Sequence, residues 1–206
     1  MCIASTAALA AILSACNHSA CHSFSADQRR IADSTVKSVR GLEALDLIYS
    51  QMCDDADLLG QMVALREKGK VLRNESRFAE ALATHSAGRD LAESLGDTIE
   101  LVQALNNIGT DYRRMGILDL AQNYHYKAWL LADDFSDSSF VAKKNRVVSL
   151  NGLANVYLSI GNLNRADSVL RLALAGETAL GSFTGQAINC ANIGAIFHQR
   201  NIPDSA

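Results

Sequence analysis

The sequence predicts an all-α fold, an α-solenoid in which antiparallel helix pairs stack one after another. Composition favours a folded helical chain, because 49% of the 206 residues are hydrophobic, 20% are charged and Pro203 is the single proline. Three segments also align without gaps, each with an aliphatic residue, then a small residue, then an aromatic residue three positions later: Ile108, Gly109 and Tyr112; Leu153, Ala154 and Tyr157; Ile193, Gly194 and Phe197. Such a recurrence is the signature of a repeat array.

The amino terminus has the pattern of a cleaved signal peptide. Residues 3–13 form a run of apolar and small residues that is too short to span a bilayer as a helix. The run leads into Leu13, Ser14, Ala15 and Cys16, which resembles the lipobox of bacterial lipoproteins. The resemblance implies that residues 1–15 are a lipoprotein signal peptide and that Cys16 is lipidated. No Lys or Arg precedes Ser14, so cleavage without lipidation, or an apolar helix packed on the domain, stays open.

A polar tether is expected over residues 16–26, which show no periodicity. Cys16, His18, Cys21 and His22 are of the residue types that ligate zinc. Four residues separate the two cysteines, however, whereas haem attachment uses C-x-x-C-H, and lipidation of Cys16 would remove one ligand. We therefore expect no metal ion and no cofactor.

The remainder of the chain is expected to be helical repeats. Residues 27–57 should form a degenerate capping helix pair, and residues 58–206 the repeats, at about 58–97, 98–139, 140–182 and, incomplete, 183–206. A weaker copy of the pattern opens the array, with Gly69 at the small position. Alanine lies twelve residues after each small residue, at Ala81, Ala121, Ala166 and Ala206. Two helices approach closely only where side chains are small, so these residues are expected at the helix contacts.

This series resembles the tetratricopeptide repeat, whose first helix presents L-G-x-x-Y and whose second presents A-x-x-x-F. The resemblance covers about residues 58–206. Successive small positions are 40, 45 and 40 residues apart rather than the usual 34, and the proline that ends the standard repeat is missing after Ala81, Ala121 and Ala166. The second helices are therefore expected to be longer, and Gly116, Gly161 and Asn201, each seven residues after a small position, are expected helix stops.

No catalytic site is expected. The chain contains no G-x-x-x-x-G-K-[ST], G-x-G-x-x-G, H-E-x-x-H or G-x-S-x-G motif. His85 and His125 each lie sixteen residues after the small position of their repeats, where the resembled family places an aromatic residue. Equivalent positions in successive repeats indicate packing, although residues from different helices could still converge into a site.

The resemblance implies a ligand groove along the concave wall built by the first helices. Its contacts would come from positions three before, one after and four after each small residue. The candidate groove residues are Arg66, Lys70, Arg73, Asn106, Thr110, Arg113, Asn151, Asn155 and His198. Basic residues at one end and amides in the middle suit an extended peptide with acidic groups. The alternative is an ordinary solvated face on which Asn106 and Asn151 bond neighbouring helices.

The sequence favours an interaction protein. Its net charge of -3 argues against binding to a nucleic-acid backbone. The leading hypothesis is a non-catalytic protein-protein interaction scaffold of the bacterial cell envelope, anchored to a membrane through Cys16 and facing the periplasm or the exterior, which binds a protein or peptide partner in its groove. The rival is the sensory amino-terminal part of a membrane-anchored signalling or transcriptional regulator.

The last repeat is expected to continue beyond this sequence, because Ala206 lies where its second helix would begin. A solenoid of this kind should end in a complete helix pair with a polar outer face. We therefore expect the apolar side of the last complete first helix, with Ile193, Ile196 and Phe197, to be only partly covered.

Overall fold

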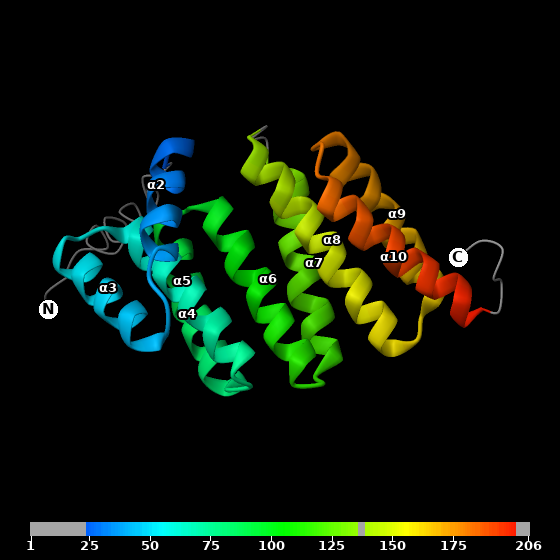
Figure 1. Cartoon of the computed structure of the whole chain (residues 1–206), viewed down its shortest axis with the longest axis horizontal. Coiled ribbons are helices and arrows are strands. Elements are labelled where there is room, and N and C mark those ends of the chain that lie inside the picture. Colours follow the sequence, from blue (N-terminus) through cyan, green and yellow to red (C-terminus); the bar gives the residue numbers. More distant parts are fainter. Residues whose placement is uncertain (1–23, 136–138, 201–206) are drawn as a thin grey trace, which may run out of the picture.

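The computed structural model describes residues 24–135 and 139–200, and within these residues every regular element is an α-helix. The helices are α2 (Ala26–Lys37), α3 (Leu42–Asp54), α4 (Leu58–Asn74), α5 (Phe78–Leu95), α6 (Thr98–Arg114), α7 (Leu118–Asp134), α8 (Phe140–Ile160), α9 (Leu163–Ala179) and α10 (Phe183–Gln199). From α3 onward each helix packs against the next, so the predicted all-α solenoid is confirmed (Figure 1). The described helices include none that is both long and apolar enough to cross a membrane.

The helices form two layers. The layer of α4, α6, α8 and α10 contains the small-residue pattern, and α5, α7 and α9 form the layer behind it (Figure 1). Within the first layer α4 also contacts α6, and α6 contacts α8. The short helix α2 departs from this order, because it packs against α4 and lies across the face of the first layer.

Small residues lie at the contacts between the layers. Ala81, Ala121 and Ala166 are completely inaccessible to solvent, as helix pairs in close approach require. The glycines opposite them leave room for rings: a Cβ built on Gly69 would lie 2.3 Å from Nε2 of His85, and one on Gly109 would lie 2.9 Å from the same atom of His125. The third repeat has Ala154 at this position and Leu170 in the slot sixteen residues later, and both are fully buried.

Tight turns connect the two helices of a repeat. Gly116 and Gly161 have φ angles of 78° and 80°, in the left-handed region that glycine adopts without steric cost. Both are the helix stops expected from the sequence, whereas Asn201 lies outside the described residues. The equivalent turn of the first repeat places Ser76 in the same conformation, with φ of 61°.

The expectation for the last complete first helix holds for Phe197, which is partly buried, and is wrong for Ile193 and Ile196. Ile193 and Ile196 are buried, at 9% and 0% exposure, and pack with Leu170 of α9. The reason is that Ile193 and Ile196 face the preceding helix of the stack.

Candidate functional site

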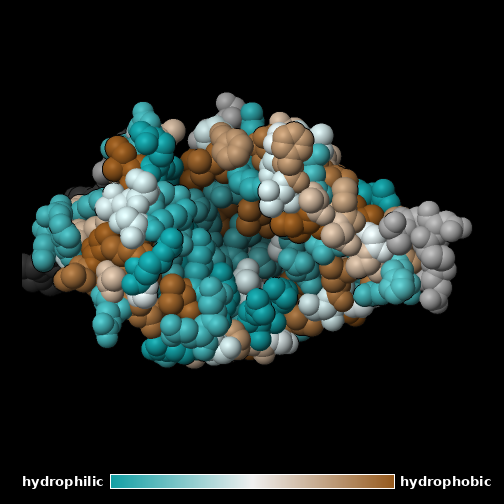
Figure 2. All heavy atoms as spheres, viewed as in Figure 1, coloured by the Kyte–Doolittle hydropathy of each residue, from teal (hydrophilic) through white to brown (hydrophobic). Residues whose placement is uncertain are grey.

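A groove of about 830 Å³ opens on the face of the first layer. Its floor is α6, with side chains from α4 beside it, and its two walls are α2 and the first turns of α8. Figure 2 shows this hollow near the middle of the molecule, with hydrophilic residues across its floor and more hydrophobic ones toward α8 and α10. The groove exists because α2 lies across α4 but stops short of α8.

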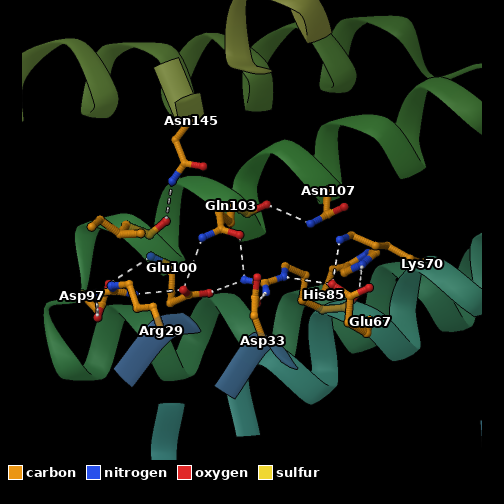
Figure 3. A network of polar contacts seen from close by, with 12 residues as sticks. Arg29, Asp33, Glu67, Lys70, His85, Asp97, Glu100, Gln103, Asn107 and Asn145 are labelled. Carbon is orange, nitrogen blue, oxygen red and sulfur yellow. Dashed lines mark hydrogen bonds and ion pairs between the residues drawn. The ribbon is translucent and has the colours of Figure 1, made fainter. Parts of the chain in front are cut away.

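The floor is built on a buried ion-pair network centred on Arg66 of α4. Figure 3 shows other members of the network, among them Asp33, Glu100 and Gln103. Nη1 of Arg66 donates to Oε2 of Glu100 at 2.8 Å and to Oε1 of Gln103 at 2.6 Å, and Nη2 donates to Asp33 of α2. Burial opposes the charge of this guanidinium, but the carboxylates of Glu100 and Asp33 raise its pKa above the usual value. Arg66 is therefore a permanently charged structural centre that joins three helices.

The same network fixes α2 in place. Nη2 of Arg29 donates to Asp97 at 2.6 Å and Nη1 donates to Glu100 at 2.9 Å, and all three side chains are at least nine-tenths buried. Asp97 also accepts a hydrogen bond from the backbone N–H of Glu100 and so caps the start of α6. Separating one of these buried charges from its partner would leave it uncompensated, which is strongly unfavourable. Buried polar contacts therefore hold α2 over α4, in addition to packing.

His85 belongs to a second buried cluster behind the floor. Its Nδ1 lies 2.5 Å from Oδ2 of Asp111, which is fully buried, and Nη1 of Arg73 donates to Oδ1 of the same carboxylate at 3.0 Å. Arg73 also donates to the side-chain oxygen of Asn107. These contacts place His85 and Arg73 in structural roles within the α4, α5 and α6 contact.

His125 occupies the equivalent slot with a less complete set of partners. Its Nδ1 bonds Oδ1 of Asn106 at 3.1 Å, and its Nε2 is buried without a hydrogen-bond partner. Burial lowers the pKa of His125 to about 4, and the positive charges of Arg113 and Arg73 act in the same direction. The ring is therefore neutral at physiological pH, which fits the interpretation of both histidines as packing residues.

Asn106 bonds neighbouring helices instead of offering its amide to a ligand. Its Nδ2 donates to Oγ of Ser149 on α8 at 2.8 Å, and that hydroxyl donates to the backbone oxygen of Asn145. Asn145 in turn donates to the backbone oxygen of Ile99 on α6. The contact between the second and third repeats is thus a chain of satisfied buried hydrogen bonds.

The groove contains some of the predicted residues and not others. Arg66, Lys70, Asn106 and Thr110 line it, but Arg66 and Asn106 are buried and their side chains are engaged as described above, because each faces an adjacent helix. The remaining candidates lie outside the lining, namely Arg73, Arg113, Asn151, Asn155 and His198. Of the predicted set, Lys70 alone brings a partly exposed cation to the groove.

The walls supply residues that the sequence did not reveal. From α2 come Arg30 and Lys37, and from α8 come Phe140, Lys144 and Val148. The α8 residues recur every four positions, which is the spacing of one helix face, and could have been found by extending the groove to the start of that helix. No sequence signal placed α2 across the concave side, because its position depends on contacts with residues about seventy positions away.

The described residues contain no cluster of His, Cys, Asp or Glu side chains that could hold a metal ion. The lipidation candidate Cys16 and residues 16–23 of the expected tether lie outside the described residues. The end of the predicted tether is wrong, because Ser25 caps α2 and Ala26 is the first residue of that helix. The groups that line the groove are side-chain ammonium and guanidinium groups, the carboxylates of Asp33 and Glu100, amides, hydroxyls and apolar carbons.

Comparisons with known proteins relate the chain to others by fold. No protein-family model matches the sequence, and no curated protein matches it. Among solved structures, the crystal structure of BtubC (BKLC) from P. vanneervenii is similar, with a TM-score of 0.58 and 14% sequence identity over 98% of this chain and 87% of that chain. At this level of identity the similarity concerns the helical fold alone.

Proposed function

We propose that this chain is a non-catalytic scaffold that binds a segment of another protein in the groove between α2 and α8. The observation that carries the proposal is the groove itself, about 830 Å³ in volume, with the partly exposed cations and apolar side chains of its walls brought together from three helices. Solenoids commonly use such extended concave surfaces for protein recognition. The small-aromatic-alanine pattern supports a relationship to tetratricopeptide-repeat proteins, which is part of the proposal.

Site-specific photo-crosslinking tests the proposal in the source cell. The full chain is made with a photoreactive phenylalanine analogue at Phe140, which lines the groove, or at Phe183, which does not. The two positions are matched, because each is the first residue of a first-layer helix and both are exposed, at 61% and 84%. We expect one defined protein to be crosslinked at position 140 and not at position 183. Equal yields at both positions, or none at either, would overturn the proposal.

We also propose that the scaffold is held at a membrane through Cys16. The support is the sequence Leu13, Ser14, Ala15 and Cys16 with the apolar run before it. The variant Cys16→Ser removes the thiol that would carry the lipid. In a bacterial host we expect this variant to leave the membrane fraction while the unaltered chain stays in it, and an unchanged distribution would refute the anchor.

A further inference from the structure

The side chains that line the groove carry more positive than negative charge, although the chain as a whole is negative. Among the described residues that line it, six are cationic and two are acidic. The cations are Arg29, Arg30, Lys37, Arg66, Lys70 and Lys144, and the acids are Asp33 and Glu100. The chain carries a net charge of -3, so this excess of positive charge is a local property of the groove.

The carboxylates that balance several of these cations lie behind the groove surface. Nζ of Lys70 bonds Glu67 at 2.8 Å, and Nζ of Lys144 bonds both oxygens of Glu177 at 2.7 Å, while neither glutamate lines the groove. An ammonium has three N–H donors, so each lysine keeps at least one beyond those contacts. Burial lowers the pKa of Lys70, Glu67 opposes this effect, and the charges of Arg66 and Lys37 lower it further.

The rim cations are held only weakly by their own partners. Lys37 pairs with Asp33 at 2.9 Å and Arg30 pairs with Asp27 at 3.3 Å. The side chains of Lys37, Arg30 and Asp27 are exposed, whereas Asp33 is half-buried and also bonded by Arg66. Exposed pairs of this kind contribute little to stability, so both cations can turn toward an incoming carboxylate at small cost. The wall formed by α2 is therefore an adaptable cationic edge.

The opposite wall presents apolar side chains on either side of one lysine. Phe140 is 61% exposed and Val148 is 40% exposed, and both lie on the side of α8 that faces the groove, one turn on either side of Lys144. The floor between the walls has little left to offer, because Gln103, Asn107 and Thr110 already bond within their own helix or to Arg66 and Glu100. Recognition is therefore left to the two walls and to Lys70 of α4.

From this arrangement we infer that the groove takes an acidic amphipathic protein segment, with carboxylates toward Arg30 and Lys37 of α2 and apolar side chains toward Phe140 and Val148 of α8. The inference rests on the proposed function and names the chemistry of its partner. Charge complementarity favours an acidic occupant, and the apolar wall favours one that also carries hydrophobic side chains. A nucleic-acid strand would match only the cationic edge, and it therefore serves as a contrary outcome of the test.

Binding of designed peptides to the full chain tests this chemistry. The probe is a fluorescent peptide of about twelve residues with Glu along one side and Leu along the other. Its counterparts have Lys in place of Glu, or Ser in place of Leu. We expect the Glu and Leu peptide to bind best in fluorescence anisotropy and its binding to weaken as salt rises. Equal binding of all three peptides, or tighter binding of a single-stranded oligonucleotide, would overturn the inference.

Matched variants locate the site. Lys37→Glu should weaken binding about threefold to tenfold, whereas Lys143→Glu, an exposed residue of α8 outside the groove, should not. Phe140→Ser should weaken it by a similar factor, whereas Phe183→Ser should not. These are surface substitutions, and circular dichroism checks that each variant remains folded.

The outcomes separate the two ideas. If photo-crosslinking at position 140 captures a partner while the acidic peptide binds equally well to all variants, the partner chemistry is wrong and the proposed function stands. If the peptide binds and responds to Lys37→Glu and Phe140→Ser as expected, the inference is supported. Absence of crosslinks at position 140 would count against the scaffold itself.

Discussion

The second and third repeats fill the same slot with different chemistry. In the second repeat His125 lies against Gly109, with a buried nitrogen that has no partner, whereas in the third Leu170 lies against Ala154. The position nine residues before the small residue differs in the same way, since Glu100 joins an ion-pair network and Asn145 makes a single hydrogen bond to a backbone oxygen.

This difference teaches that the repeat determines the size of the side chain at a helix contact and its position in the sequence, but not whether that side chain is polar. A ring in the slot requires glycine opposite, because a methyl group there would collide with it, and a branched aliphatic side chain leaves room for alanine. The first two repeats can therefore accommodate charge at their contacts, and it is this charge that positions α2 and builds the groove. The third repeat contributes the apolar side chains of Phe140 and Val148 to the opposite wall, and its own buried charge, Glu177, pairs with Lys144.

The largest expected effect is at Glu100. Glu100→Gln removes the carboxylate that two buried guanidinium groups share, and we expect it to lower the free energy of unfolding by about 3 to 5 kcal/mol. Asn145→Ala, at the equivalent position of the third repeat, removes one neutral hydrogen bond and should cost about 1 to 2 kcal/mol. Urea unfolding of both variants measures the contrast. Equal losses of unfolding free energy in the two variants would mean that the ion-pair network around Glu100 stabilises the fold no more than a neutral hydrogen bond does.

The second effect concerns pH. The folded pKa of His125, about 4, lies below the value of about 6.5 expected in the unfolded chain, so the unfolded state binds more protons between these two values. Stability from this residue is complete above about pH 6.5 and is lost as pH falls toward 4, by roughly 3 kcal/mol in total.

His125→Leu copies the third repeat and should remove this dependence. Urea unfolding at several pH values gives the free energy of unfolding of the variant and of the unaltered chain. Carboxylates titrate in both proteins, so their contribution cancels when the two free energies are subtracted. A constant offset is expected as well, because Oδ1 of Asn106 loses its partner in the variant. Parallel pH profiles for the two proteins would show that the ring is not held neutral by burial.

A third prediction tests the match between slot and small residue. Gly109→Ala places a methyl group 2.9 Å from the ring of His125 and should destabilise the chain by about 1 to 3 kcal/mol. In the His125→Leu background the same substitution should cost less, because the pair then matches Ala154 and Leu170. Thermal unfolding in a double-mutant cycle gives the coupling free energy. Additive effects would mean that the two positions are not in contact.

The sequence predicted the solenoid because its regularly spaced small residues mark the positions at which two helices are in close contact. Gly69, Gly109 and Ala154 are constrained by sterics alone, which a single sequence can reveal. The groove was harder to predict, since position along a first helix does not tell whether a side chain faces solvent or the next helix. Arg66 and Asn106 face adjacent helices, and their partners Asp33 and Ser149 are distant in the sequence. Lys37 reaches the groove only because α2 crosses α4.

The smallest expected effect is in the turns between the two helices of a repeat. The turns allow the repeats to be compared at a position where side-chain packing plays no part. The equivalent turn position is Ser76 in the first repeat and Gly116 in the second, with φ of 61° and 78°. A side chain in this conformation costs about 1 to 2 kcal/mol, partly offset by the greater freedom of glycine in the unfolded chain. Ser76→Gly should therefore raise stability by about 0.5 to 1 kcal/mol, a shift of roughly 1 to 4 °C in Tm for a chain of this size.

Gly116→Ser should lower stability by a similar amount, because a Cβ there meets no atom within 4 Å and only the backbone conformation is tested. Differential scanning calorimetry of both variants checks the pair, and shifts of the same sign would show that the turn conformation is not what distinguishes the two repeats.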